Sequence, residues 1–305
     1  MATESPRPFV LPNAASRSLR PPELLDATPR VPTGVPDFDF LTGGLPAGSV
    51  VLLFGAAGAG HLEFALTSAV HLMLRYDDPH MHEFYLGNAK GPFVFPVSVD
   101  YVSTSRSREQ VMGELRGAFD GTYPGVLGRH LTFHDLSPAY FADTPVPAAW
   151  SSVASGLLSG APARTGGDEG PLPALADAMD HLGDNHLVIV DSITDLLVRR
   201  EIDATDVLTL VKGLRRRAKE WGGLVYLLLS EGVAPPSTEQ AVVDSVDGVL
   251  HFHWVSSSTH SHRQRAMLIE KFMPLLARLP SEQQGRFVIR VSGKGGLVTT
   301  QYERI

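Results

Sequence analysis

Six consecutive residues between an apolar run and a stretch of helical periodicity are the part of this sequence best suited to chemistry. All six are glycine or alanine: Gly55, Ala56, Ala57, Gly58, Ala59 and Gly60. Their spacing matches the start of the phosphate-binding motif G-x-x-x-x-G-K-[ST], in which successive backbone N–H groups converge on phosphate oxygens. The N-terminus of a following helix adds a favourable dipole. We therefore predict that residues 55–60 form a candidate nucleotide-binding loop.

The two side chains that complete this motif are replaced. His61 stands at the Lys position, and Leu62 stands at the Ser/Thr position. In the motif, the Lys neutralises the β- and γ-phosphates and the hydroxyl binds Mg²⁺. An imidazole is shorter and mostly neutral at pH 7, and a leucine offers the metal no ligand. The backbone cradle is expected to persist, with weak ATP binding at most and without Mg²⁺.

A carboxylate follows another apolar run further along the chain. Asp191 comes directly after Leu187–Val190 and precedes Ser192. Proteins with a phosphate-binding loop carry a magnesium-associated Asp at the end of a second buried strand. We predict that Asp191 occupies this position and belongs to the same site. The structural alternative, an Asp that caps the next turn, is compatible with it.

Alternating apolar runs and amphipathic stretches must position these residues. We predict strands at 49–54, 93–102, 131–133, 187–190 and 224–229, and helices at 61–75, 107–119 and 205–221. Continuously apolar strands that alternate with helices indicate an α/β fold with a doubly wound, mainly parallel sheet. Beyond Gly248 the strands have short connections, which predicts an antiparallel C-terminal extension.

Composition limits the classes of function. The 305 residues carry a net charge of −7, with 43% hydrophobic residues. The acidic balance argues against a nucleic-acid binder. With 0 Cys, thiol catalysis and cysteine metal sites are excluded. No apolar run approaches the ~20 residues of a membrane helix, and the N-terminal residues lack the apolar core of a secretory signal. We expect a cytoplasmic protein that does not contact membranes.

The chain divides into a tail and one domain. Residues 1–30 are rich in Pro, Ser and Arg and predict a flexible N-terminal arm, followed by a single domain at 31–305. An arm that packs on a neighbouring subunit is the alternative, because Phe9 and Leu24 could dock. Residues 155–175 are dominated by Gly, Ala and Pro, which indicates a mobile insertion.

Two further groups of side chains invite a functional interpretation. Four imidazoles crowd into one segment, at His251, His253, His260 and His262. Three or four of them would suit Zn²⁺, but no carboxylate or fixed spacing supports a zinc site here. Arg215–Arg217 form a basic patch, which is either a solvated helix face or a surface for an acidic partner. The loop at 232–238 lacks basic and aromatic residues, which argues against DNA strand binding.

Several segments together resemble a known family. TGVPDFDFLTGGLPAGSVVLLFGAAGAG, DYVSTSRSREQV, LVIVDSITDLL, GGLVYLLLSEG and GRFVIRVSGKGGLVTTQYERI are similar to RecA-superfamily ATPases of the KaiC-like branch. Within that branch the chain most resembles archaeal transducer-like (HTR-like) proteins, and HDLSPAYFADTPVPAAW is typical of them. The resemblance runs from about residue 31 to the C-terminus. It implies a RecA/KaiC-like fold and a degenerate Walker A motif.

At most positions that correspond to the family's catalytic residues, this chain has a different residue. In active members two consecutive Glu residues activate water, and their positions here hold Ser105 and Arg106. Neither side chain is a general base near neutral pH, and Glu109, one helical turn further, is better explained as a solvated residue. The Lys-x-Arg pair that reaches a neighbouring subunit corresponds to Lys271 and Met273.

The resemblance and the replacements together lead to three hypotheses. The first is a non-hydrolysing regulatory or scaffolding protein that forms homo-oligomers, or hetero-oligomers with KaiC-like relatives, in signalling or cell organisation. The second is a slow ATPase that binds ATP through Gly55–Gly60 with support from His61 and Asp191. The third keeps a nucleotide as a structural ligand held by backbone amides without metal.

Overall fold

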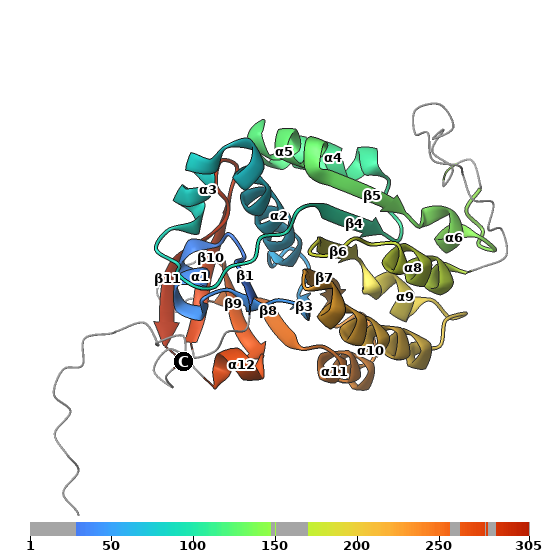
Figure 1. Cartoon of the computed structure of the whole chain (residues 1–305). Helices are drawn as coiled ribbons and strands as arrows, with labels where there is room; N and C mark the ends of the chain where they lie inside the picture. Colours follow the sequence, from blue (N-terminus) through green and yellow to red (C-terminus); the bar gives the residue numbers. More distant parts are fainter. Residues whose placement is uncertain are drawn as a thin grey trace, which may run out of the picture.

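The computed structural model describes residues 29–147, 150, 170–256, 263–277, 279 and 285–304. A large mixed sheet runs through the molecule, with helices on both faces (Figure 1). In spatial order its strands are β11 (Gly296–Arg304), β10 (Gly285–Ser292), β9 (Arg263–Lys271), β8 (Gly248–Ser256), β3 (Ser49–Gly55), β7 (Leu224–Ser230), β6 (Leu187–Asp191), β4 (Val99–Ser103) and β5 (Leu131–Asp135). A small second sheet joins β1 (Arg30–Val31) to β2 (Leu45–Pro46).

The helices alternate with the parallel strands along the chain. They are α1 (Pro36–Thr42), α2 (His61–Asp77), α3 (Pro79–Leu86), α4 (Arg108–Ala118), α5 (Thr122–His130), α6 (Ser137–Phe141), α8 (Pro171–Asp180), α9 (Ile193–Val198), α10 (Ala204–Trp221), α11 (Pro236–Ser245) and α12 (Met273–Leu276). Strands β8, β3, β7, β6, β4 and β5 pair in parallel, whereas β8 to β11 pair antiparallel. The predicted fold class is therefore confirmed.

Strand β3 lies in the middle of the sheet and is buried on both faces. Val51 and Leu53 belong to the core beneath α2, and Val50 and Leu52 belong to the core beneath α10. This two-sided burial explains why the strand is a continuous apolar run. The register pairs Gly55 with Ser230 on β7, so the two strands end at the same edge.

The second expected strand is shorter than its sequence suggested. Residues 93–102 were predicted as one strand, but β4 begins only at Val99. Phe93 makes an isolated bridge to Arg30, and the segment around it is irregular. Pro92 and Pro96 explain the difference, because a proline has no N–H to donate to a neighbouring strand.

Two predicted segments fall at the limits of the described residues. The expected arm at 1–30 lies outside them apart from Pro29 and Arg30. Most of the expected insertion at 155–175 also lies outside them, while its last residues, from Pro171, form the start of α8. None of the helices in the described ranges has the length and apolarity that a bilayer crossing requires.

A buried polar cluster attaches the turn before α1 to helix α2. Asp39 accepts hydrogen bonds from the Thr33 amide and hydroxyl and from the Gly34 amide, at 2.8–2.9 Å. His71 donates through Nδ1 to the Gly34 carbonyl at 2.7 Å, so its Nε2 accepts from the Tyr123 hydroxyl at 2.9 Å. Gly34 has φ +75°, and a Cβ there would lie 2.6 Å from the His71 Cβ. The turn thus fits only a glycine.

This cluster predicts a specific dependence of stability on pH. Burial lowers the pKa of His71 to about 4, against about 6.5 in an unfolded chain. Between these values the unfolded chain binds a proton that folded His71 does not, so the contribution of His71 to the free energy of unfolding falls as the pH falls. Burial raises the pKa of Asp39 to about 7, which gives that carboxyl the opposite trend, so the effect of His71 is read from the difference between wild type and variant. We expect His71 to contribute a loss of about 2 kcal/mol between about pH 7 and about pH 5. Urea unfolding of wild type and His71→Gln at both pH values measures it. An equal loss in both proteins would contradict the assignment.

Candidate functional site

The loop at 55–60 joins β3 to α2, as the sequence predicted. Its first two residues are fixed to neighbouring segments: the Glu231 amide donates to the Gly55 carbonyl at 2.9 Å, and the Ala56 amide donates to the Phe252 carbonyl at 3.2 Å. Gly60 is the N-cap of α2 with φ +117°, a conformation that L-residues with a side chain rarely adopt. The sequence therefore builds the strand, loop and helix that an anion cradle needs.

Two side chains from the antiparallel extension hold the middle of the loop. Trp254 on β8 donates from Nε1 to the Ala57 carbonyl at 3.2 Å, and Arg265 on β9 donates from Nε to the Gly58 carbonyl at 2.8 Å. In a trans peptide the C=O and the next N–H point in opposite directions. The amide of Gly58 is therefore directed away from Trp254.

His61 begins α2 but does not supply a positive charge. Burial lowers its pKa, against the opposing effects of Glu63 and Asp191. Its Nδ1 is buried and has no hydrogen-bond partner within the described part of the chain. Leu62 is partly buried and packs against the core beneath α2. At pH 7 the loop therefore ends in a neutral imidazole and an apolar side chain, where the motif has an ammonium and a hydroxyl.

Asp191 ends β6 at the same edge of the sheet, and an arginine from the adjacent strand end binds it. Arg106 forms an ion pair with the Asp191 carboxylate, and the Tyr101 hydroxyl donates to the same oxygen. Arg106 also donates to the Tyr101 hydroxyl at 2.8 Å and to Glu114 at 2.6 Å. The side chain of Asp191 is 13% exposed and that of Arg106 is 25% exposed.

The arrangement keeps this guanidinium charged. Burial lowers the pKa of Arg106, but Tyr101 and Asp191 raise it by more, so the net pKa lies above its ordinary value. The pKa of Tyr101 is also raised, mainly because the ring is buried and because Asp191 lies beside its hydroxyl. A permanent cation therefore occupies one of the two positions that the sequence resemblance aligns with the catalytic glutamates of active KaiC-like proteins.

The other position aligned with a catalytic glutamate holds Ser105, whose hydroxyl already donates a hydrogen bond. Ser105 donates to the Asp195 carboxylate at 2.9 Å, and the Thr104 hydroxyl donates to the same oxygen. Glu109 lies in the first turn of α4 and is exposed. Sequence reasoning missed Asp195, although its spacing of four residues after Asp191 could have drawn attention to it.

Lys271 forms hydrogen bonds within its own chain. Its Nζ donates to the carbonyls of Val243, Asp244 and Val246 at 2.8–2.9 Å, which satisfies the C-terminal end of α11. Met273, which the sequence resemblance aligns with the trans-acting Arg of active KaiC-like proteins, is 79% exposed. Met273 therefore exposes an apolar side chain to solvent, and the ammonium group of Lys271 is bound to carbonyls of its own chain.

The histidine-rich segment is only partly described. His251 places Nδ1 3.0 Å from Glu270 and Nε2 3.4 Å from Glu231. The hydrogen bond to Glu270 raises the pKa of His251, burial opposes it, and Glu231 adds to it. His260 and His262 lie outside the described residues. The sequence did not predict the two carboxylates, because they come from other strand ends.

Ion pairs within the chain reduce the charge of the predicted basic patch. Arg215 lies 2.8 Å from Asp247, and Lys219 lies 3.3 Å from the same carboxylate. Arg217 pairs with Glu220 at 2.6 Å. Much of the positive charge on this face of α10 is therefore compensated locally, as a solvated helix face requires.

The geometry predicts that Arg106 and Asp191 stabilise the fold as a unit. Arg106→Gln leaves a mostly buried carboxylate with one neutral donor, so we expect unfolding free energy to fall by about 2 kcal/mol, discounted for partial exposure. Asp191→Asn should cost a similar amount, and the double variant less than the sum. Chemical denaturation measures the cycle, with Arg116→Gln on the exposed face of α4 as the matched control. Additive losses would show that the two side chains do not interact.

Comparison with solved structures establishes the fold. The structure is similar to a KaiC-like protein from the hyperthermophilic archaeon Pyrococcus horikoshii, with a TM-score of 0.59 and 18% sequence identity, over 90% of this chain and 100% of that one. No family model and no curated protein sequence matches the chain. At this identity the similarity concerns the fold alone. The chain has the RecA/KaiC-like α/β fold, with a mainly parallel sheet and an antiparallel C-terminal extension.

Proposed function

We propose that this chain is a degenerate member of the KaiC-like group that does not hydrolyse ATP and acts as a regulatory or scaffolding component. The observation that supports this most directly is the Arg106–Asp191 ion pair. It places a guanidinium on the carboxylate that would otherwise associate with Mg²⁺.

The electrostatics of the pair oppose a bound magnesium ion. Mg²⁺ needs nearly octahedral oxygen coordination and loses its water reluctantly, so it binds where carboxylates and hydroxyls are free. Asp191 is already neutralised by Arg106, and Leu62 supplies no oxygen. A metal at this edge would have to displace the arginine and leave its charge without a partner. We infer that ATP binds here without Mg²⁺.

The two positions that would supply the general base for ATP hydrolysis also hold no carboxylate. Active relatives are expected to activate water with a carboxylate, whereas this chain has the engaged hydroxyl of Ser105 and the guanidinium of Arg106. His61 is a neutral imidazole rather than a cation that stabilises the γ-phosphate. Each of these groups contributes orders of magnitude to the rate of phosphoryl transfer. Their combined loss supports a binding role.

Isothermal titration and a phosphate-release assay test this proposal. We expect weak ATP binding that added Mg²⁺ does not strengthen, and no phosphate release above the buffer rate. The restored variant His61→Lys, Leu62→Thr, Arg106→Glu should bind ATP more tightly with Mg²⁺ than without it, by about tenfold or more. Steady phosphate release by the wild type that Asp191→Ala abolishes would overturn the proposal.

A slow ATPase is the second candidate, because one carboxylate remains at this edge. Asp195 accepts hydrogen bonds from Thr104 and Ser105 beside the end of β4. If Asp195 acts as an atypical base, Asp195→Asn should abolish turnover while ATP affinity stays the same. The absence of turnover in wild type would exclude this alternative.

The scaffolding role predicts an assembly of several copies, or of this chain with KaiC-like relatives. Met273 supports it, because an apolar side chain that is 79% exposed stands where active relatives are expected to present a cation to a neighbour. Native mass spectrometry should show a multimer that Met273→Asp weakens. Val198→Asp, at a position 45% exposed at the end of α9, is the matched control. A monomer at all concentrations would exclude self-association.

A further inference from the structure

Three titratable side chains from three different strands meet beside the loop at 55–60. His251 on β8 places Nδ1 3.0 Å from a carboxylate oxygen of Glu270 on β9. Its Nε2 lies 3.4 Å from a carboxylate oxygen of Glu231, the residue directly after β7. The His251 side chain is mostly buried, whereas both carboxylates are partly exposed. One imidazole therefore lies between two carboxylates.

The geometry of this cluster requires a proton on each nitrogen of the ring. A carboxylate oxygen accepts hydrogen bonds and donates none, and a neutral imidazole has a single N–H. Either neutral tautomer of His251 would therefore turn a lone pair toward Glu231 or toward Glu270. The imidazolium satisfies both carboxylates. Its contact with Glu231 is the longer one, an ion pair without the alignment of a hydrogen bond.

The surroundings of the ring favour the charged state. The hydrogen bond to Glu270 raises the pKa of His251, burial opposes the rise, and Glu231 adds to it. The same hydrogen bond lowers the pKa of Glu270. Both partners thus shift in the direction that an attractive pair requires. Phe54 on β3 contributes an apolar ring, whose centroid lies 5.0 Å from that of His251.

A second histidine faces the same cluster. The ring of His253 lies 5.5 Å from the ring of His251 on the same strand. Burial lowers the pKa of His253, His251 and Arg286 on β10 lower it further, and Glu231 opposes them. The pKa values of the two histidines therefore move in opposite directions, and His251 takes up the first proton as the pH falls.

The backbone beside this cluster holds the start of the loop. The amide of Glu231 donates to the Gly55 carbonyl at 2.9 Å. The carbonyl of Phe252, the residue after His251, accepts from the Ala56 amide at 3.2 Å. Two of the hydrogen bonds that fix the loop thus come from a member of the cluster and from the neighbour of another. A movement of Glu231 would be transmitted directly to the loop.

We propose that His251 is a proton-dependent tie that holds the loop at 55–60. When protonated, His251 bridges Glu231 and Glu270 and fixes the end of β7 to the antiparallel extension. When it loses a proton, its one N–H stays with Glu270, and Glu231 is released. The tie is complete below about pH 6.5 and is lost as the pH rises through the raised pKa of folded His251. It needs no nucleotide and does not rest on the proposed function.

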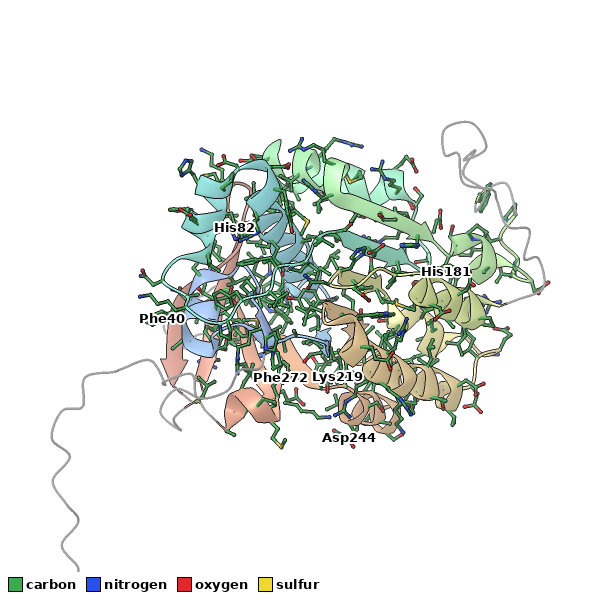
Figure 2. All side chains as sticks on the ribbon, viewed as in Figure 1. Phe40, His82, His181, Lys219, Asp244 and Phe272 are labelled. Carbon is green, nitrogen blue, oxygen red and sulfur yellow. The ribbon has the colours of Figure 1, made fainter. Side chains whose placement is uncertain are left out.

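Nuclear magnetic resonance of the full chain tests the tie. The ring C–H signal of His251, assigned by its absence in His251→Gln, should titrate with a midpoint above about pH 6.5. Glu270→Gln removes the closer carboxylate and should lower this midpoint by about one pH unit. His181 is the internal control, because Figure 2 shows it at the end of α8, away from β8 and β9. Its titration should be the same in both proteins. A wild-type His251 midpoint at or below about pH 6.5 would overturn the inference.

Amide hydrogen exchange tests whether the tie reaches the loop. After correction for the intrinsic effect of pH, protection of the Glu231 and Ala56 amides should fall about fivefold between about pH 6 and about pH 8.5. The fall should follow the titration of His251. In His251→Gln the protection of both amides should not depend on pH, and the surface variant His181→Gln should behave as the wild type. Unchanged protection of both amides while His251 titrates would overturn the coupling to the loop.

Discussion

The ion pair between Arg106 and Asp191 is the interaction on which the proposed function depends. Strands β4 and β6 pair in parallel with Ser103 opposite Asp191, so the residues just after β4 end beside that carboxylate. A glutamate at position 106 would compete with Asp191 for protons or attract a metal, whereas an arginine neutralises it. The Tyr101 hydroxyl completes the set of donors to Asp191. The Asp191 carboxylate therefore finds its donors among the side chains of this chain.

The loop beside it retains its shape for a different reason. Backbone hydrogen bonds from Ala56 and Glu231, and the side chains of Trp254 and Arg265, fix the loop from the adjacent strands. None of these contacts uses the motif lysine or hydroxyl. The loop conformation can thus persist after the groups that act on the γ-phosphate are replaced. Under the proposed function, the chain keeps the fold and the loop without the groups that accelerate phosphoryl transfer.

The sequence predicted those features that depend on local patterns. Apolar runs located β3, β6 and β7, and helical spacing located α10, because burial on both faces of a sheet and on one face of a helix leaves a clear signature. The glycine spacing placed the loop correctly. Pro92 and Pro96 shortened the strand expected at 93–102, which the pattern of apolar residues alone did not reveal.

Contacts between distant segments could not be predicted in the same way. Arg106 and Asp191 are 85 residues apart, and only the strand order brings them together. The capping of α11 by Lys271 and the contact of His251 with Glu270 likewise depend on the register of β8 and β9. A local pattern shows which side chains are present, but the sheet topology decides which of them neutralise one another.

Electron paramagnetic resonance of Mn²⁺ tests the central claim most directly, because Mn²⁺ replaces Mg²⁺ and reports its own coordination. The protein, ATP and Mn²⁺ are mixed at concentrations that saturate the nucleotide site. With Asp191 occupied by Arg106, the spectrum should be that of Mn²⁺ bound to ATP in solution, and Arg106→Glu should convert part of it to a protein-bound signal. A protein-bound signal in the wild type that disappears in Asp191→Ala would contradict the account.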